Sequence, residues 1–167
     1  MTEQTTQKKY ELLKDDTVEH FGRTLYRIKA LITFGLVGAG ELGGYIETEK
    51  NLDHSGNAWV YDNALVYGNA EVYGNAEVYG DALVCGNALV RSFAVISERK
   101  MIFGASNVGS ENGRLTVFNG KFGLIVTRGC FTGTVDEFLS KSKEVHDDKT
   151  HHEYKLLIEV AQSRILN

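Results

Sequence analysis

The most regular pattern of hydrophobic and polar positions in this chain has a period of six residues and runs through its middle third. Small and large apolar residues alternate within each six-residue word, because an alanine lies two positions before each aliphatic residue up to Ile96. Such alternation is typical of short strands with one buried face. Gly-Asn, Asp-Asn and Gly-Asp pairs separate the words and predict tight turns. The aliphatic positions are Val60, Val66, Val72, Val78, Val84, Val90, Ile96 and Ile102.

The unvarying length of the words predicts parallel strands, since antiparallel hairpins would reverse the chain at every turn. Three words would complete one triangular coil of 18 residues. Residues 18 positions apart would then stack about 4.8 Å from one another in neighbouring strands. This arrangement predicts three columns of β-branched core residues. The columns are Val60 with Val78 and Ile96, Val66 with Val84 and Ile102, and Val72 with Val90 and Val108.

Both ends of the repeats carry patterns that predict caps, which an array of strands needs because unpaired edges promote aggregation. Before the repeats, "VEHFGRTLYRIKAL" predicts a β-hairpin that turns near Phe21–Gly22. Its predicted apolar contacts are Leu25, Ile28 and Leu31. The distance from Leu52 to Val60 is eight residues where six is the rule, which predicts a two-residue bulge around Asp53–Gly56.

After the repeats, apolar stretches on either side of Asn119–Gly120 predict a second hairpin, because Asn-Gly favours tight turns. Two threonine–glutamate pairs have the spacing of a capping box and predict two helices that fold back on each other. The pairs are Thr134 with Glu137 and Thr150 with Glu153. The predicted domains are therefore an N-terminal hairpin cap over 1–36, a hexapeptide-repeat region over 37–110, and a C-terminal hairpin with two helices over 111–167.

Composition narrows the possible functions. The 167 residues carry a formal net charge of −4, which argues against binding duplex nucleic acid through a general basic surface. The two cysteines indicate neither a disulfide framework nor a metal pattern. The segment "MTEQTTQKKYELLKDD" has no apolar core of a signal peptide, and no apolar run reaches the roughly 18 residues needed to span a membrane. We therefore expect a reduced, cytoplasmic protein without membrane contact.

The word V-Y-G-N-A-x resembles the hexapeptide repeat of left-handed parallel β-helices, with an aliphatic residue and a small residue four positions later, as in Val66 and Ala70. Segments outside it, such as "GELGGYIETEKNL" and "RLTVFNGKFGLIVTRGCFTGTVDEF", are similar to uncharacterised phage and prophage proteins. The resemblance implies a mainly β fold: a short left-handed parallel β-helix solenoid with an N-terminal β-hairpin cap and a C-terminal β-hairpin plus two-helix hairpin. It also implies a homo-oligomer, with a trimer favoured, in the host cytoplasm.

The outward positions of the repeats carry the candidate contact surfaces. One side presents an apolar stripe of Leu65, Leu83 and Met101, and exposed apolar patches usually mark interfaces. We expect an oligomer interface there, and the alternative is that a terminal segment of the same chain covers the stripe.

Tyrosines follow four of the core valines and form a candidate ligand or partner surface: Tyr61, Tyr67, Tyr73 and Tyr79. Tyr61 should stack on Tyr79, and Tyr73 should lie below Arg91. The more conservative interpretation is that these rings only shield the corners of the coils. The functional alternative is an aromatic groove for a planar ligand, with Arg91 as its cation.

Basic residues gather towards the C-terminal end of the repeats and suit a local anion site, because arginine matches phosphate geometry. The candidate ligand-binding residues are Arg91, Arg114 and Arg128. The competing interpretation is scattered charge that keeps the protein in solution. His146, His151 and His152 lie in "HDDKTHHE", which is interpreted as a solvated linker rather than a metal site. No metal, cofactor or catalytic residue is predicted.

Three classes of function remain open. The first is a non-enzymatic accessory binding protein that blocks a host protein of antiviral defence or sequesters a small anionic nucleotide signal. The second is a structural or assembly module of a phage. The third is an acyltransferase, as many hexapeptide proteins are. His54 is the candidate base for that reaction, but the sequence shows no carboxylate partner at a useful spacing. The dispersed polar groups favour the binding protein.

Overall fold

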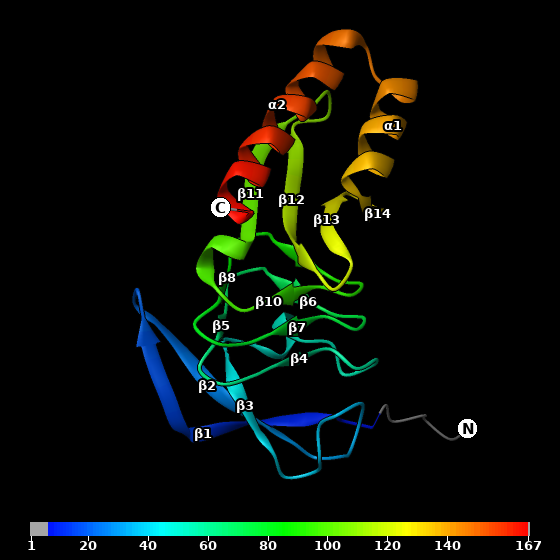
Figure 1. The fold of residues 1–167 in the computed structure, drawn as a ribbon. Coiled ribbons are helices and arrows are strands. Elements are labelled where there is room, and N and C mark those ends of the chain that lie inside the picture. Colours follow the sequence, from blue (N-terminus) through cyan, green and yellow to red (C-terminus); the bar gives the residue numbers. More distant parts are fainter. Residues whose placement is uncertain (1–6, 167) are drawn as a thin grey trace, which may run out of the picture.

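The computed structural model describes residues 7–166 and is mainly β, with two helices at its C-terminal end (Figure 1). The predicted segments 1–36 and 111–167 extend past the described residues, by residues 1–6 and by residue 167. The longer strands are β1 Tyr10–His20, β2 Arg23–Ala30, β3 Leu42–Ile46, β11 Ile102–Val108, β12 Gly113–Gly120, β13 Gly123–Arg128 and β14 Phe131–Thr134. The two-residue strands are β4 Trp59–Val60, β5 Leu65–Val66, β6 Glu71–Val72, β7 Glu77–Val78, β8 Leu83–Val84, β9 Leu89–Val90 and β10 Val95–Ile96.

The predicted fold class, a short left-handed parallel β-helix solenoid, is wrong. The strands within residues 7–166 form four separate sheets. One is mixed, because antiparallel β1, β2 and β3 continue into parallel β5 and β8. A second, made of β11, β12, β13 and β14, is antiparallel. The other two are the short parallel ladders β10-β7-β4 and β6-β9. The antiparallel strands at both ends are up to 11 residues long and pair more backbone groups than the two-residue strands of the repeats can.

Within the repeat region, which is β4 to β10, the predicted spacing of strand partners is confirmed. Val60 pairs in register with Val78, and Val78 with Ile96. Val66 pairs with Val84, and Val72 with Val90. Successive strands belong to the three parallel ladders in turn, so each turn of chain rests on the one before it (Figure 1).

Two predicted columns have the wrong members at their ends. Ile102 pairs antiparallel with Phe118, and Val108 pairs with Gly113, so both belong to the C-terminal sheet. At the other end Ile46 pairs with Val66, and Leu52 bridges to Val72. These partners are 20 residues apart instead of 18, so the predicted two-residue insertion after Leu52 is confirmed.

The core of the repeat region is built from alternating alanine and valine side chains. Ala76 and Val78 are fully buried, as are their equivalents along the repeats. The turns between words need a left-handed backbone at one position, which glycine adopts without strain. Gly68 and Gly74 both have φ of +71°, and Asp62 and Ser92 take the same conformation at equivalent positions. A side chain at Gly80 would come within 2.5 Å of the Ser97 carbonyl, so the next turn also excludes one.

The N-terminal hairpin turns at Phe21–Gly22, as predicted, and β2 pairs with β3 along the mixed sheet. Leu25 and Ile28 are fully buried, as predicted. Leu31 is 43% exposed and is not part of the buried core, so its predicted apolar contact is wrong. Leu31 lies beyond the end of β2, where the strand no longer holds its side chain against the repeats.

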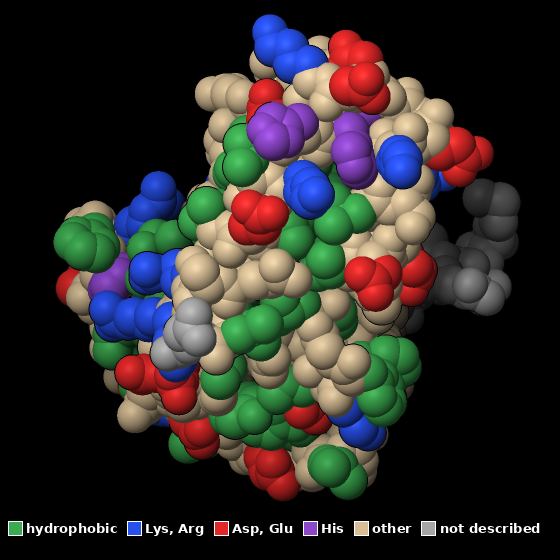
Figure 2. Space-filling view, turned by 45° about the horizontal axis from the view of Figure 1, so that its top comes forward, with side chains coloured by type: hydrophobic (Ala, Val, Ile, Leu, Met, Phe, Trp, Pro, Cys, Tyr) green, Lys and Arg blue, Asp and Glu red, His purple; other side chains and the backbone are tan. Residues whose placement is uncertain are grey.

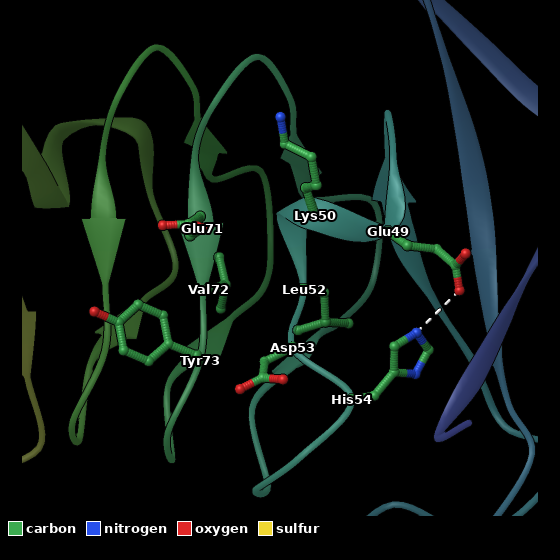
Figure 3. Close-up of a pocket in the computed structure, with 8 residues that line it drawn as sticks. All are labelled: Glu49, Lys50, Leu52, Asp53, His54, Glu71, Val72 and Tyr73. Atoms are coloured by element: carbon green, nitrogen blue, oxygen red, sulfur yellow. Dashed lines mark hydrogen bonds and ion pairs between the residues drawn. The ribbon is translucent and has the colours of Figure 1, made fainter. Parts of the chain in front are cut away.

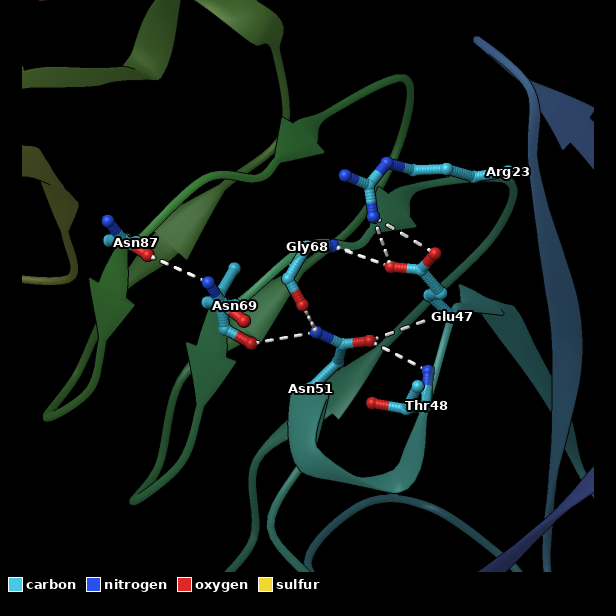
Figure 4. Close-up of polar contacts among 8 residues, drawn as sticks. Arg23, Glu47, Thr48, Asn51, Gly68, Asn69 and Asn87 are labelled. Atoms are coloured by element: carbon cyan, nitrogen blue, oxygen red, sulfur yellow. Dashed lines mark hydrogen bonds and ion pairs between the residues drawn. The ribbon is translucent and has the colours of Figure 1, made fainter.

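Side chains satisfy the backbone groups that the irregular first turn leaves without a strand partner. The buried amide of Asn51 donates to the carbonyls of Gly68 and Ala70 at 3.2 and 2.8 Å (Figure 4). Its oxygen accepts from the backbone N–H groups of Glu47 and Thr48. Because the backbone N–H of Asn51 donates to the Thr48 carbonyl within the turn Glu49–Asn51, the side chain supplies the hydrogen bonds to the next turn of chain that this N–H cannot make.

Lys9 likewise supplies a hydrogen bond to a backbone carbonyl, at the edge of the β4 ladder. Its Nζ donates to the carbonyl of Ala58 at 2.7 Å and lies 4.7 Å from the centre of the Phe34 ring. The residue is 1% exposed. Burial lowers the pKa of Lys9 to about 8, and the charge of Asp53 opposes this change.

The C-terminal sheet differs from the predicted hairpin in size and in the place of its turn. Asn119 and Gly120 lie within β12 and pair with Leu124 and Gly123, so the chain reverses two residues later, at Lys121–Phe122. The strands β11 and β14 extend the pair to four strands.

The helices are α1 Val135–Val145 and α2 Asp148–Ile165, and 3-10 turns lie at η1 Glu49–Asn51 and η2 Arg99–Met101. The Thr134 hydroxyl accepts from the N–H of Glu137, so the first predicted cap is confirmed. The second is wrong, because Asp147 caps α2 and the helix begins before Thr150. Both helices pack on one face of the C-terminal sheet (Figure 1). Within the described part of the chain, no helix combines the length and apolar character needed to cross a membrane.

Candidate functional site

A pocket with a volume of about 420 Å³ forms a groove beside η1 and β6 (Figure 3). We call it the acidic groove, because Glu49, Asp53 and Glu71 line it with Lys50, His54 and Tyr73. Its acidic groups are largely occupied by local contacts. Asp53 accepts hydrogen bonds from the backbone and hydroxyl of Ser55. Glu49 contacts His54 and Lys8.

His54 has a carboxylate partner that the sequence did not predict. Its Nε2 lies 2.9 Å from Oε1 of Glu49 (Figure 3). Its Nδ1 accepts the backbone N–H of Lys9 at 3.1 Å, which puts the imidazole proton on Nε2. The ring also stacks on Tyr10 with centroids 4.1 Å apart. Both nitrogens are thus engaged with the protein, and neither lone pair is directed at a substrate, as a general base requires.

The contacts with His54 and Lys8 change the pKa of Glu49. Burial alone would raise the pKa of this carboxyl group. The hydrogen bond from His54 and the charge of Lys8 outweigh burial and lower the pKa below its ordinary value. The cluster therefore holds η1 against the N-terminal hairpin and gives the acidic groove no evident reactive group.

Another pocket, of about 300 Å³, has the opposite character and lies where β9 meets β12 and β13. We call it the arginine pocket. The polar residues that line it are Asn87, Glu111, Arg114, Thr116, Thr127 and Arg128. Its volume is at the lower end of the range for small-molecule sites. It brings together two of the three arginines that the sequence predicts as ligand-binding residues.

Both arginines that line this pocket carry buried nitrogens without an acceptor among residues 7–166. Nη1 of Arg114 donates to the Ser106 hydroxyl at 3.1 Å, but its Nε is buried and has no hydrogen-bond partner within residues 7–166. Nε and Nη2 of Arg128 are buried in the same way. Buried donors without acceptors are costly, and an anion is the partner that satisfies them best.

Glu111 is the one carboxylate among the described residues that line the arginine pocket. Its Oε2 lies 3.7 Å from Nη1 of Arg128, and its side chain is 80% exposed. Exposed ion pairs of this kind contribute little stability. An entering anion would therefore displace Glu111 at small cost.

Arg128 is held from its other side by the ring of Tyr154, whose centroid is 5.6 Å from the guanidinium carbon. Burial raises the pKa of Tyr154, and the charge of Arg128 opposes that rise. The phenol therefore stays protonated at neutral pH and places no negative charge beside Arg128.

The third predicted arginine has a different position. Arg91 donates to the carbonyls of Gly129 and Phe131 at 3.2 and 2.7 Å, and also to the hydroxyl of Tyr73. It therefore fastens the turn between β13 and β14 to the repeat region. It does not line the arginine pocket.

The four predicted tyrosines do not form one groove. Tyr61 and Tyr79 stack edge to face, with centroids 6.3 Å apart, and Tyr73 lies under Arg91, as predicted. Tyr67 lies beside Cys85, as expected from the 18-residue spacing, and also against His20 and Arg23 of the N-terminal hairpin. Burial and the neighbouring Cys85 raise the pKa of Tyr67 to about 12. The rings belong to three different ladders, which favours the corner-shielding interpretation.

The apolar stripe is only partly open. Leu65 and Leu83 pair in register and are half-buried, and the next residue on that ladder, Tyr45, is buried beneath Arg27 of the hairpin. Met101 lies in η2 and is half-buried. The oligomer interface remains a prediction.

The histidines near the helix turn do not converge. His146 lies against the Tyr154 ring, whereas Nδ1 of His151 is 3.1 Å from the Ser142 hydroxyl. Among residues 7–166 no group of three or more His, Cys, Asp and Glu side chains is placed to hold a metal ion.

Sequence reasoning missed several members of the site. Thr116 and Thr127 look like ordinary strand residues, and only the antiparallel register places them opposite each other between the arginines. Glu111 lies in a loop without a motif. The pair Glu49–His54 has a five-residue spacing that no helix or strand pattern would have selected.

No protein-family model matches this chain, and no curated protein is significantly similar to it. The resemblance to phage and prophage proteins therefore stays a prediction from the sequence. The function has to be argued from the geometry and charge of the arginine pocket.

Proposed function

We propose that this protein is a non-enzymatic binding module that captures a small, phosphate-bearing anion in the arginine pocket. The observation that carries the proposal is the set of buried guanidinium nitrogens on Arg114 and Arg128 that lack an acceptor at a pocket of about 300 Å³. Arginine presents several donors in a fixed fork that matches a phosphate group. Such a site can bind an anion without catalysing a reaction.

The composition of the pocket supports binding over catalysis. The Thr127 hydroxyl already donates to the carbonyl of Leu89 at 3.1 Å, so it is not poised as a nucleophile. Glu111 is exposed and paired with Arg128. The described lining residues include no histidine or cysteine that could transfer a proton or attack a substrate.

The biological role that we propose is the one expected from the sequence. A phage-type accessory protein in the host cytoplasm, acting as a homo-oligomer, would sequester an anionic nucleotide signal by holding its phosphate groups. The role rests on the resemblance, whereas the anion site rests on the arginines.

Isothermal titration calorimetry with pyrophosphate tests the anion site. Arg114→Gln should weaken binding about tenfold or more, because it removes a charged donor. Arg99→Gln, on the exposed turn η2, is the matched control and should bind as the unaltered protein does. Glu111→Gln should strengthen binding about threefold by removing the competing carboxylate. Absence of pyrophosphate binding, or equal losses in the two arginine variants, would overturn the proposal.

A second candidate function is the blocking of a host protein, favoured by an exposed aromatic pair. Phe122 is 81% exposed and meets Phe93 edge to face at 5.8 Å, and Leu36 is 92% exposed near the same ladder. Figure 2 shows further apolar side chains open on the face below the helices. Exposed patches of this kind often mark protein contacts.

A native mass spectrum of protein purified gently from a bacterial host separates the two candidates. A species larger than a multiple of 18.5 kDa by another polypeptide, lost in Phe122→Asp, would favour blocking. An excess of a few hundred daltons, lost in Arg114→Gln, would favour ligand capture.

A further inference from the structure

A separate pocket of about 240 Å³ adjoins the arginine pocket, between the turn after β13 and helix α1. We call it the ring pocket. The lining residues that it does not share with the arginine pocket include Cys130, Phe131, Phe138, Lys141, Val145 and His146. Glu111, Arg128 and Gly129 line both pockets. The two pockets are thus neighbours on either side of Arg128.

The chemistry of the ring pocket is unlike that of the arginine pocket. Phe131 and Phe138 lie with ring centroids 5.5 Å apart, and Val145 leaves 57% of its surface exposed at the end of α1. A cavity with apolar walls and a few polar groups is typical of sites that hold a flat organic ring. Lys141 and His146 place hydrogen-bonding groups at its margin.

Arg128 connects the two pockets. Its guanidinium is fixed over Tyr154, so its position does not depend on a ligand. Two of its nitrogens are buried without an acceptor in the described chain. A ligand that places a phosphate group beside Arg128 and Arg114 can extend its remaining part past Gly129 into the ring pocket. Gly113 lies beside this arginine, and a Cβ there would be 3.4 Å from Nη2 of Arg128.

We propose that one ligand occupies both pockets: a phosphorylated compound with a flat heteroaromatic ring, of the nucleoside phosphate class. Its phosphate groups bind Arg114 and Arg128, and its ring packs against Phe131 and Val145. The inference rests on the proposed function, because it assigns the class of ligand to the same anion site.

The exposed thiol of Cys130 provides a native reporter for the ring pocket, since it lies in the lining. Alkylation by iodoacetamide is followed at Cys130 and Cys85 by peptide mass mapping. Adenosine, guanosine, cytidine and uridine diphosphates are the probes, with pyrophosphate as the ringless comparison. At least one nucleoside diphosphate should slow alkylation of Cys130 about fivefold or more and leave the rate at Cys85, outside both pockets, unchanged.

Calorimetry on two matched variants tests the ring contact itself. Val145→Trp fills the ring pocket from an exposed helix position, whereas Val160→Trp makes the same change on α2, where Val160 is 52% exposed. Val145→Trp should weaken nucleoside diphosphate binding about tenfold and leave pyrophosphate binding unchanged. Val160→Trp should alter neither.

The outcomes separate the two proposals. If pyrophosphate does not bind, or binds without dependence on Arg114, the anion site itself is wrong. If pyrophosphate binds through Arg114, but no nucleoside diphosphate binds more tightly or protects Cys130, only the ring assignment is overturned. A loss of pyrophosphate binding in Val145→Trp would also contradict it, because the ring pocket would then be part of the anion site.

Discussion

The repeat region and the C-terminal sheet solve the same problem of burying apolar surface in different ways. The repeat region uses two-residue strands and a core of alanine and valine that recurs every six residues. The C-terminal sheet uses strands of up to eight residues and packs Leu115, Val117 and Val126 against two helices in a separate cluster. Periodic packing leaves little room between turns. The irregular region leaves spaces between its loops and helices, and both pockets of the proposed site border it.

The same difference between the two regions determines where side chains are left free to bind a ligand. In the repeats each outward side chain is followed by an equivalent one on the next turn, so polar groups form ladders such as Asn69 donating to Asn87 (Figure 4). In such a ladder the polar side chains are hydrogen-bond partners of one another. In the C-terminal region Arg114 and Arg128 come from strands with no repeat, and Nε of Arg114 and Nε and Nη2 of Arg128 remain without acceptors among residues 7–166. Binding residues are often placed on such irregular segments beside a rigid scaffold.

The largest expected effect comes from a charge in the periodic core. Val78 is fully buried at the centre of the β10-β7-β4 ladder. Val78→Asp should unfold the protein, because an unpaired carboxylate there costs several kcal/mol or forces the turns apart. Circular dichroism during thermal melting measures the loss. Val95→Asp, on the outward side of β10, is the control, and a cooperative melt in Val78→Asp would contradict the tight packing described for the repeats.

Removal of the Asn51 side chain, which links the turn η1 to the next turn of chain, should cost less. Asn51→Leu leaves the carbonyls of Gly68 and Ala70 and two backbone N–H groups without their partners. The free energy of unfolding in urea should fall by about 3 kcal/mol. A fall of less than about 0.5 kcal/mol would mean that water replaces these hydrogen bonds and that η1 does not depend on the Asn51 side chain.

The contact between the two regions can be weakened at Arg91. Arg91→Met removes the hydrogen bonds to Gly129 and Phe131 while keeping most of the apolar stem, and should destabilise the protein by about 2 kcal/mol. Hydrogen exchange should accelerate most at the turn between β13 and β14. Equal acceleration throughout the repeats would contradict the assignment of Arg91 to this junction.

The smallest effect concerns pH at the N-terminal edge of the repeats. The pKa of Lys9 is about 8 in the folded protein and 10.5 ordinarily. Between these values the unfolded chain binds the proton that the folded protein has released, so stability should rise with pH. From pH 8 to pH 9 the gain should be about 1 kcal/mol, measured by urea unfolding. Burial raises the pKa of Tyr10, so its loss of stability begins only above about pH 10 and lies outside this interval.

Lys9→Met provides the control for this titration. The variant should show a flatter dependence of stability on pH between 8 and 9, whatever its stability at pH 7. An unchanged slope would place the proton exchange on another group.

The sequence by itself determined the features that depend on neighbours in a repeating pattern. The six-residue period set the pairing of Val60 with Val78 and of Val72 with Val90, and the eight-residue gap after Leu52 located the insertion. These features follow from local rules, because each turn contacts only the turns beside it. The hairpin turn at Phe21–Gly22 and the cap at Thr134 are local in the same sense.

Tertiary structure decided where the pattern stops and what the irregular segments do. Ile102 has the spacing of a repeat residue, yet it pairs with Phe118 because an antiparallel partner of several residues outweighs one more short ladder. The same long-range pairing places Thr116 opposite Thr127 and brings Arg114 and Arg128 to one pocket, although no motif joins them. It also turns Arg91 towards a backbone loop instead of a ligand. Contacts between distant segments depend on how the whole chain packs, and no periodicity in the sequence encodes them.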